Sequence, residues 1–151
     1  MSSDSASTAD FNTCAFCRIV TGLQEAHLVF EEDSSIAFLD IRPVFQGHVL
    51  LIPRTHYATM MDLPAELGCR LFSNAQLLAR AVEGAMAADG VFVAINNRVS
   101  QSVPHVHIHL VPRRFKDGLR GFFWPRTKYP DQAAVERVRA SISQAIQELM
   151  A

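Results

Sequence analysis

Gln101-Ser102-Val103-Pro104-His105-Val106-His107-Ile108-His109-Leu110-Val111-Pro112 is the stretch that decides how the rest of the sequence is interpreted. His105, His107 and His109 alternate in it with apolar residues, and this period of two predicts a β-strand with one apolar face. The three imidazoles are expected on the other face, because side chains two positions apart point the same way. Each imidazole carries polar nitrogens that need partners, so three in alternation favour a functional site over half-exposed surface histidines.

The composition indicates one soluble globular domain. The chain has 151 residues, 49% hydrophobic and 19% charged, and its net charge of −1 gives no basic field for nucleic acid or an anionic membrane. No apolar run reaches the roughly 18–20 residues of a membrane span. Residues 1–12 are small and polar, without the apolar segment of a secretory signal, so we expect a disordered tail ahead of a single domain at 13–151. Three cysteines, two of them as Cys14-x-x-Cys17, favour a metal or redox pair in the cytoplasm over a disulfide framework.

Apolar periodicity predicts an α+β fold with an antiparallel sheet. Besides the histidine strand, we expect strands at 28–31, 36–40, 48–53 and 91–96, the last of which pairs with the histidine strand. A short helix over 16–20 precedes them, and a final helix is expected over about 131–149. Asp62-Leu63-Pro64 opens a long helix, with Asp62 as its cap. Its apolar stripe consists of Leu67, Leu71, Leu78, Val82 and Met86.

The histidine stretch suits attack on phosphorus. A histidine nucleophile forms a phosphorus–nitrogen bond that is readily hydrolysed, so one difficult displacement becomes two easier steps. The attacking nitrogen must be neutral, with the other ring nitrogen fixed by a hydrogen bond. The middle histidine is well placed, because its neighbours can hold the phosphate oxygens. Gln101 and Ser102 offer a carboxamide and a hydroxyl near a leaving group, and His48 on an adjacent strand adds a further donor.

A metal site competes for the same histidines. Cys14 and Cys17 have the spacing of half a tetrahedral zinc site. A redox pair is the alternative, but a thioredoxin-like pair follows a buried strand and this one follows a polar tail. His56 is a candidate third ligand, and one strand histidine would be the fourth. The spacing leaves open which of the three it is.

Taken together, these motifs resemble the histidine triad (HIT) family of nucleotide hydrolases and transferases. The stretch from Gln101 to Val111 is similar to the family signature, and Cys14-Ala15-Phe16-Cys17, residues 37–41 and residues 47–56 match further motifs in order. The resemblance covers about residues 14–113, with a C-terminal segment at 114–151 beyond it. The Cys-x-x-Cys is characteristic of the bacterial zinc-containing branch. The resemblance implies a HIT-like fold with a five-stranded antiparallel sheet, one long helix and a C-terminal helix.

The resemblance also implies roles for individual residues. His107 would attack the α-phosphorus, His109 and His48 would orient the phosphate, and Gln101 and Ser102 would contact the scissile bridge. A second set would bind the nucleotide: Asp40 on the ribose hydroxyls, Phe16, Ile19 and Phe38 around the base, and Asn96 or Asn97 near the sugar and phosphate. For each apolar residue a plain core role carries about equal weight. Four residues would hold a structural zinc ion: Cys14, Cys17, His56 and His105.

The sequence departs from the family pattern in one loop. Asn97-Arg98-Val99-Ser100 is shorter than its usual counterpart and has no glycine. The leading hypothesis is a cytoplasmic, homodimeric zinc protein that hydrolyses purine nucleoside 5′-phosphoramidates or dinucleoside polyphosphates and releases a nucleoside monophosphate. The short loop motivates an alternative, a nucleotide-binding or adaptor protein with vestigial catalysis. A redox protein using Cys14 and Cys17 is the third hypothesis.

Overall fold

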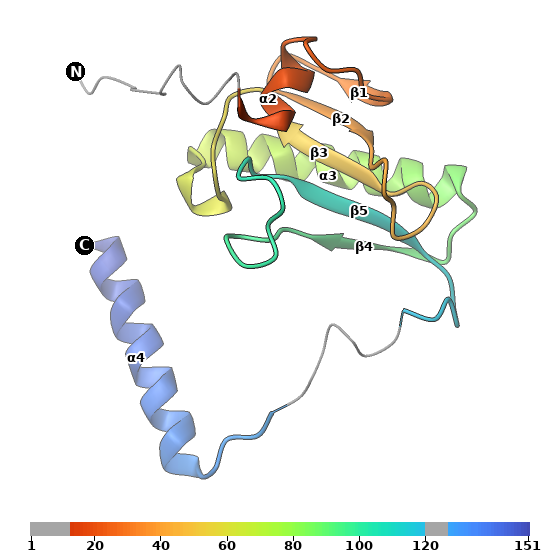
Figure 1. Cartoon of the computed structure of the whole chain (residues 1–151). Coiled ribbons are helices and arrows are strands. Elements are labelled where there is room, and N and C mark those ends of the chain that lie inside the picture. Colours follow the sequence, from red (N-terminus) through yellow and green to blue (C-terminus); the bar gives the residue numbers. More distant parts are fainter. Residues whose placement is uncertain (1–12, 120–126) are drawn as a thin grey trace, which may run out of the picture. The chain divides into compact units, whose positions relative to one another are not determined.

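An antiparallel sheet of five strands, in the order β1-β2-β3-β5-β4, carries the site described below (Figure 1). The computed structural model describes residues 13–119 and 127–151, so the predicted tail at 1–12 lies outside the described residues. The strands are β1 (Leu28–Glu31), β2 (Ser35–Leu39), β3 (Val49–Pro53), β4 (Gly90–Ala94) and β5 (Ile108–Arg113). The helices are α2 (Ala15–Val20), α3 (Ala65–Ala85) and α4 (Gln132–Met150), with a 3₁₀ turn η1 (Met60–Asp62). The predicted α+β class with a five-stranded antiparallel sheet is confirmed.

The histidine strand starts later than its alternation predicts. β5 begins at Ile108, so only His109 lies in it, and the expectation that three histidines share one strand is wrong for His105 and His107. Their segment is bonded elsewhere, because Val106 N–H donates to the carbonyl of Tyr57 at 2.7 Å. The predicted antiparallel pairing of β4 with β5 is confirmed.

The two faces of the sheet bury different helices. One face packs on α3, where Leu71, Ala75, Leu78 and Val82 meet apolar residues of β2, β3 and β5. The long predicted helix is therefore confirmed, with Leu67 and Met86 partly buried beside it. The opposite face packs on α2, and its buried members are Cys14, Phe16, Cys17, Ile36, Phe38, Leu50 and Ile52. The register places Leu50 opposite both Phe38 and His109, so the cysteine-bearing helix and His109 share this face.

The start of the long helix differs from the prediction. Asp62 does not cap α3, which begins at Ala65 after Pro64. Its carboxylate instead accepts hydrogen bonds from the N–H and the hydroxyl of Thr59, at 2.9 and 2.7 Å, in a capping box around η1. The reason is local: Pro64 supplies the extended residue before the helix, so the short turn ends before α3 starts.

The described chain forms two compact units, Met1–Phe115 and Lys116–Ala151. The second contains α4, the expected final helix, whose first turn is capped by Asp131 accepting from Ala134 N–H at 2.7 Å. Ala134 is buried, whereas Ile142 and Ile146 are exposed. A single domain at 13–151 stays a prediction.

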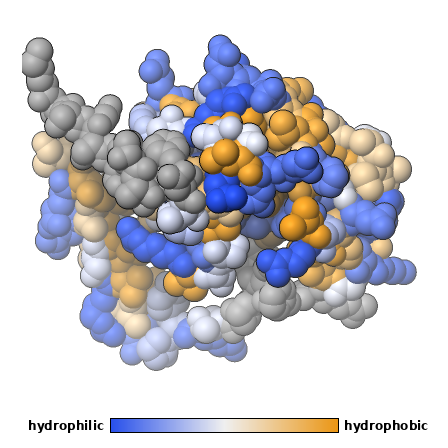
Figure 2. All heavy atoms as spheres, turned by 45° about the horizontal axis from the view of Figure 1, so that its top comes forward, coloured by the Kyte–Doolittle hydropathy of each residue, from blue (hydrophilic) through white to orange (hydrophobic). Residues whose placement is uncertain are grey.

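Hydrophobic and hydrophilic residues are interspersed on the molecular face drawn in Figure 2. Within the described ranges, no helix combines the length and the hydrophobicity that crossing a bilayer requires.

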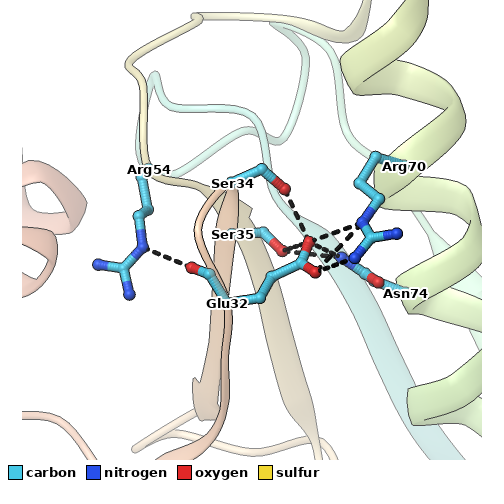
Figure 3. Close-up of polar contacts among 6 residues, drawn as sticks. All are labelled: Glu32, Ser34, Ser35, Arg54, Arg70 and Asn74. Atoms are coloured by element: carbon cyan, nitrogen blue, oxygen red, sulfur yellow. Dashed lines mark hydrogen bonds and ion pairs between the residues drawn. The ribbon is translucent and has the colours of Figure 1, made fainter.

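Glu32 ties the turn between β1 and β2 to helix α3 (Figure 3). Its carboxylate accepts hydrogen bonds from Ser34 Oγ at 2.7 Å, from Asn74 Nδ2 at 2.5 Å and from the guanidinium of Arg70, whose Nη2 lies 2.5 Å away. The hydrogen bond from Arg70 is the largest of several effects that lower the pKa of Glu32 to about 2. This cluster fixes the sheet against α3 at its polar edge.

Replacing Glu32 with Gln is expected to lower the free energy of unfolding by about 1–2 kcal/mol at pH 7, because the amide loses the charge-assisted bonds. The depressed pKa contributes stability that is present above pH 4.5 and lost as the pH falls toward 2. Urea unfolding at pH 7 and at pH 3 should therefore show a smaller difference between wild type and variant at pH 3.

Glu31→Gln is the matched control, because the Glu31 side chain, paired with Arg54, is 59% exposed. It should change stability little at either pH. A pH-independent difference for Glu32→Gln would contradict the assignment.

Candidate active site and metal cluster

Helix α2 brings the two cysteines onto the sheet. Cys14 is the residue before the helix and Cys17 lies in its first turn, where both are buried, Cys17 completely. Three residues make roughly one helical turn, so the two thiols point to the same side. The local fold thus turns the Cys-x-x-Cys spacing into a pair of converging sulfur atoms.

Four sequence-predicted residues come together around these sulfurs. His105 Nδ1 lies 3.6 Å from Cys14 Sγ and 3.5 Å from Cys17 Sγ, and His56 Nδ1 lies 3.3 Å from Cys17 Sγ. All four ligand atoms are within 4.8 Å of one another. Two ligands of one tetrahedral zinc ion lie about 3.6 Å apart when one is sulfur and the other nitrogen. The donor set and its spacing therefore fit a closed tetrahedral metal site.

His105 is the histidine that joins the cluster, a choice that spacing alone left open. Its Nε2 lies 2.8 Å from the carbonyl oxygen of Pro53, which can only accept, so Nε2 carries the proton and Nδ1 presents a lone pair to the cysteines. Burial lowers the pKa of His105 to about 4, which the Pro53 hydrogen bond offsets only in part. The imidazole is thus neutral, as a metal ligand must be.

The backbone of His105 also fixes His107. His107 Nδ1 lies 2.7 Å from the carbonyl oxygen of His105, so Nδ1 donates and Nε2 is left with its lone pair. Burial lowers the pKa of His107 below the ordinary histidine value. Its ring meets Phe16 edge-on, with 5.1 Å between ring centroids. His107 is therefore held in the tautomer that a nucleophile at Nε2 requires.

A chain of hydrogen bonds assigns the tautomers of His48 and His109. Val44 N–H donates to His48 Nδ1 at 3.2 Å, so His48 carries its proton on Nε2. His48 Nε2 lies 3.0 Å from His109 Nδ1, which then accepts and leaves the proton of His109 on Nε2. Among the described residues, His109 Nε2 is a buried polar atom with no hydrogen-bond partner. A buried donor of this kind is costly unless something binds it, so it marks a place for an acceptor.

A cavity of about 280 Å³ opens beside these histidines. Seven of the residues predicted from the sequence line it: Phe16, Ile19, Phe38, Asp40, Ser102, His107 and His109. The phenyl rings of Phe16 and Phe38 lie edge to face, with 5.5 Å between centroids, so one part of the cavity is an apolar slot. Asp40 accepts a hydrogen bond from Arg42 N–H at 2.8 Å and stands at the polar side. The cavity thus combines an apolar wall, a carboxylate and the two histidines.

Several lining residues were missed by sequence reasoning. Leu50 faces the cavity opposite His109; its strand was predicted from a nearly continuous apolar run, which does not distinguish one face of the sheet from the other. Gln24, Glu25 and Arg42 also line the cavity. They lie in irregular segments after α2 and β2, where no periodic pattern indicates which way a side chain points.

Four of the residues predicted to be catalytic or to bind the nucleotide do not line the cavity. They are Asn96, Asn97, Gln101 and His48, although His48 contacts the lining residue His109. Asn97 Oδ1 accepts from Met60 N–H at 2.8 Å, and the carboxamide of Gln101 bonds the carbonyl of Ala58 and the N–H of Arg98. Contacts of these side chains with a nucleotide stay predictions.

The site and the fold define a histidine triad protein, and the comparisons agree. The HIT domain family matches residues 21–116, so the chain belongs to the HIT family. It is 36% identical over 114 residues to the adenosine 5′-monophosphoramidase HNT1 of Saccharomyces cerevisiae, covering 74% of this chain and 70% of that one. It is 33% identical over 110 residues to the adenylylsulfatase HINT3 of Arabidopsis thaliana, covering 72% of this chain and 56% of that one.

Solved structures confirm the HIT-like fold. A HIT-family protein of Bacillus subtilis superposes with a TM-score of 0.76 at 31% identity, covering 87% of this chain and 95% of that one. A zinc-bound histidine triad protein of Mycobacterium smegmatis gives a TM-score of 0.69 at 34% identity, covering 91% and 99%. The second likeness supports the zinc-containing branch.

Acid is expected to destabilise the fold through His109. Burial, with His107 and His48 nearby, lowers the pKa of His109 to about 4, partly offset by Asp40. The unfolded chain therefore binds more protons between pH 6.5 and 4, and the free energy of unfolding falls as the pH drops through that range. One such group contributes at most about 1.4 kcal/mol per pH unit. Urea unfolding of His109→Gln at pH 7, 6 and 5 should show a shallower fall than wild type.

The matched control is His27→Gln, which removes an exposed imidazole and should keep the wild-type slope. Comparing slopes cancels any loss of metal in acid that the proteins share. Equal slopes for wild type and His109→Gln would show that this histidine is not held neutral by the fold.

Proposed function

We propose that this chain is a nucleotide hydrolase that cleaves nucleoside 5′-phosphoramidates or dinucleoside polyphosphates at the α-phosphate and releases a nucleoside monophosphate. The observation that carries the proposal is the opposite protonation of Nε2 in His107 and in His109, whose ring centroids lie 4.8 Å apart. His107 Nε2 presents a lone pair, while His109 Nε2 presents a buried proton without a partner, and both residues line the same cavity. A nucleophile beside a donor for a phosphate oxygen is what in-line displacement at phosphorus needs.

The proposed reaction has two displacements. His107 Nε2 attacks the α-phosphorus and a phosphorus–nitrogen bond forms, while the bond to the leaving group breaks and the leaving group departs with the electron pair. Ser102 passes a proton to it. Water then attacks the phosphorus and gives its proton back to Ser102, the bond to His107 breaks, and Nε2 regains its lone pair. His109 donates to a phosphate oxygen in both steps. The hydrogen bond from His48 Nε2 keeps His109 Nδ1 occupied.

The remaining cavity residues support a purine nucleoside as the bound part. Phe16, Ile19 and Phe38 form the apolar wall that would take the base, and Asp40 would accept from the ribose hydroxyls. The names of two relatives, an adenosine 5′-monophosphoramidase and an adenylylsulfatase, support adenylyl compounds as substrates.

His107→Ala is expected to reduce turnover at least about a thousandfold, because it removes the nucleophile. The measurement is release of AMP from adenosine 5′-phosphoramidate and from diadenosine tetraphosphate, with folding checked by urea unfolding. His27→Ala, which changes an exposed histidine, should keep wild-type rates. A fully active His107→Ala would exclude the mechanism. Binding of AMP by wild type without turnover of either compound would favour a nucleotide-binding or adaptor protein.

We further propose that Cys14, Cys17, His56 and His105 hold a structural zinc ion. The four donors close the coordination shell, so the metal would stabilise the fold and leave His107 free for chemistry. Bound zinc would also cross-link α2 to the segment after β3, which lies far from it in the sequence.

Removing the metal is expected to lower the melting temperature by at least about 5 °C, because binding energy at a structural site is folding energy. Metal analysis should give one zinc per chain for wild type and little for Cys17→Ser. Cys69→Ser is the matched control, since Cys69 is exposed and lies outside the cluster. Purified protein without zinc, or chelation without a thermal shift, would contradict the assignment.

We also propose that the chain forms a homodimer in the cytoplasm. Strand β4 lies at an edge of the sheet, where its outer backbone groups can pair with another strand. Beside it, a groove lined by Met60, Phe72 and Val93 is mostly apolar, and Phe72 is 67% exposed. An edge strand of the sheet next to exposed hydrophobic side chains supports a second copy of the chain as the partner.

A further inference from the structure

The loop before the histidines holds two residues in an unfavourable backbone conformation. Arg98 has φ 69° and Ser100 has φ 61°, and neither is a glycine. Side chains disfavour this left-handed region, because Cβ approaches the following carbonyl oxygen. The backbone bonds of the loop are few: Val99 N–H donates to Asn97 O at 2.9 Å, and the bond from Gln101 N–H to Arg98 O is long, at 3.5 Å. Backbone bonding within the loop therefore does not account for its shape.

Side chains of the loop supply the missing support. The carboxamide oxygen of Gln101 accepts from Arg98 N–H at 2.8 Å, and its Nε2 donates to the carbonyl of Ala58 at 2.6 Å. Asn97 Oδ1 accepts from Met60 N–H at 2.8 Å. Gln101 thus closes the loop on itself and fastens it to the 58–60 segment at the same time.

The segment that receives these bonds is itself fixed at both ends. His56, two residues before Ala58, joins the metal cluster with its Nδ1 3.3 Å from Cys17 Sγ. The carbonyl of Tyr57 accepts from Val106 N–H at 2.7 Å. Thr59 is held by the capping box with Asp62. The loop is therefore fastened to a rigid support.

The position of the loop determines the position of Ser102. Ser102 follows Gln101 directly and lines the cavity that holds His107 and His109. It also lines a second cavity, of about 380 Å³, together with His56 and Ala58. Ser102 thus lies between the histidines and the 58–60 segment to which Gln101 fastens the loop.

We propose that Gln101 is a positioning residue, whose carboxamide clamps the strained loop onto the 58–60 segment and so holds Ser102 at the leaving-group side of the cavity. Its effect on turnover rests on the proposed function, whereas its effect on the loop does not. Because Phe16 and Asp40 bind the nucleoside elsewhere, loss of the clamp acts on kcat and leaves the KM for the nucleotide nearly unchanged.

The test combines Gln101→Ala with relief of strain at position 98. Gln101→Ala is expected to lower kcat about 10–100-fold, since a displacement of about 1 Å costs that much in a positioned site. Hydrogen exchange at the amides of residues 98 and 99 should rise at least about tenfold. Arg98→Gly in the same chain should recover about fivefold or more of the loss in kcat and of the protection at residue 99, whose N–H keeps its acceptor on Asn97, because glycine adopts a positive φ without the side-chain penalty.

Ala87→Gly is the matched control, because Ala87 also has a positive φ, 46°, but lies at the end of α3, outside the loop. It should rescue neither quantity. Gln101→Glu keeps the acceptor for Arg98 but sets an oxygen against the Ala58 carbonyl, so it should lower kcat by breaking the link to the 58–60 segment.

The outcomes separate the clamp from the chemistry. Reduced kcat with unchanged amide exchange, or no rescue by Arg98→Gly, would overturn the proposal and indicate that Gln101 contacts the substrate. If wild type released no AMP, the proposed function would fail, while exchange in Gln101→Ala and its recovery with Arg98→Gly would still decide whether the clamp exists.

Discussion

The hydrogen bond from His105 Nε2 to the carbonyl of Pro53 is the contact on which both the cluster and the site depend. It fastens the histidine segment to the end of β3 and turns His105 Nδ1 toward the two cysteine sulfurs. The carbonyl of the same residue accepts from His107 Nδ1. One residue therefore supplies a donor to the Cys/His cluster with its side chain and fixes the tautomer of His107 with its backbone. Because His105 is buried, losing its bond to Pro53 would leave His105 Nε2 and the Pro53 carbonyl oxygen without this partner, which is costly in free energy.

The register of the sheet supplies the other half of the arrangement. Pairing β3 with β5 sets Leu50 opposite His109, so His109 faces α2 rather than α3. The α3 face is an apolar core. Its burial offsets the free-energy cost of the α2 face, where several histidines are desolvated and kept neutral. A shift of one residue in this register would turn His109 into the α3 core. The sheet pairing is thus as much a functional constraint as a structural one.

Periodic features could be predicted from the sequence, and contacts between distant backbone groups could not. The strand over 48–53 and the stripe on α3 follow from the spacing of apolar residues, and the Cys-x-x-Cys pair was found by its spacing. The alternation of the histidines was also real, but it did not show where the ladder begins, because Val106 N–H bonds the carbonyl of Tyr57 instead of continuing β5. The imidazoles of His105 and His107 donate to the carbonyl groups of Pro53 and His105. Which histidine joins the cysteines, and which nitrogen carries each proton, depends on these acceptors.

Gln101 is a second residue whose contacts with distant backbone groups could not be predicted from the sequence. Its place before the triad suggested contact with the scissile bridge, yet its carboxamide is occupied by Ala58 and Arg98. The reason lies in the loop before it: without glycine, the backbone at Arg98 and Ser100 is strained, and a strained segment persists only where its surroundings hold it. A carboxamide, with one donor side and one acceptor side, can bridge two backbone groups at once. Gln101 is therefore engaged with the backbone because the loop has no glycine at its two strained positions.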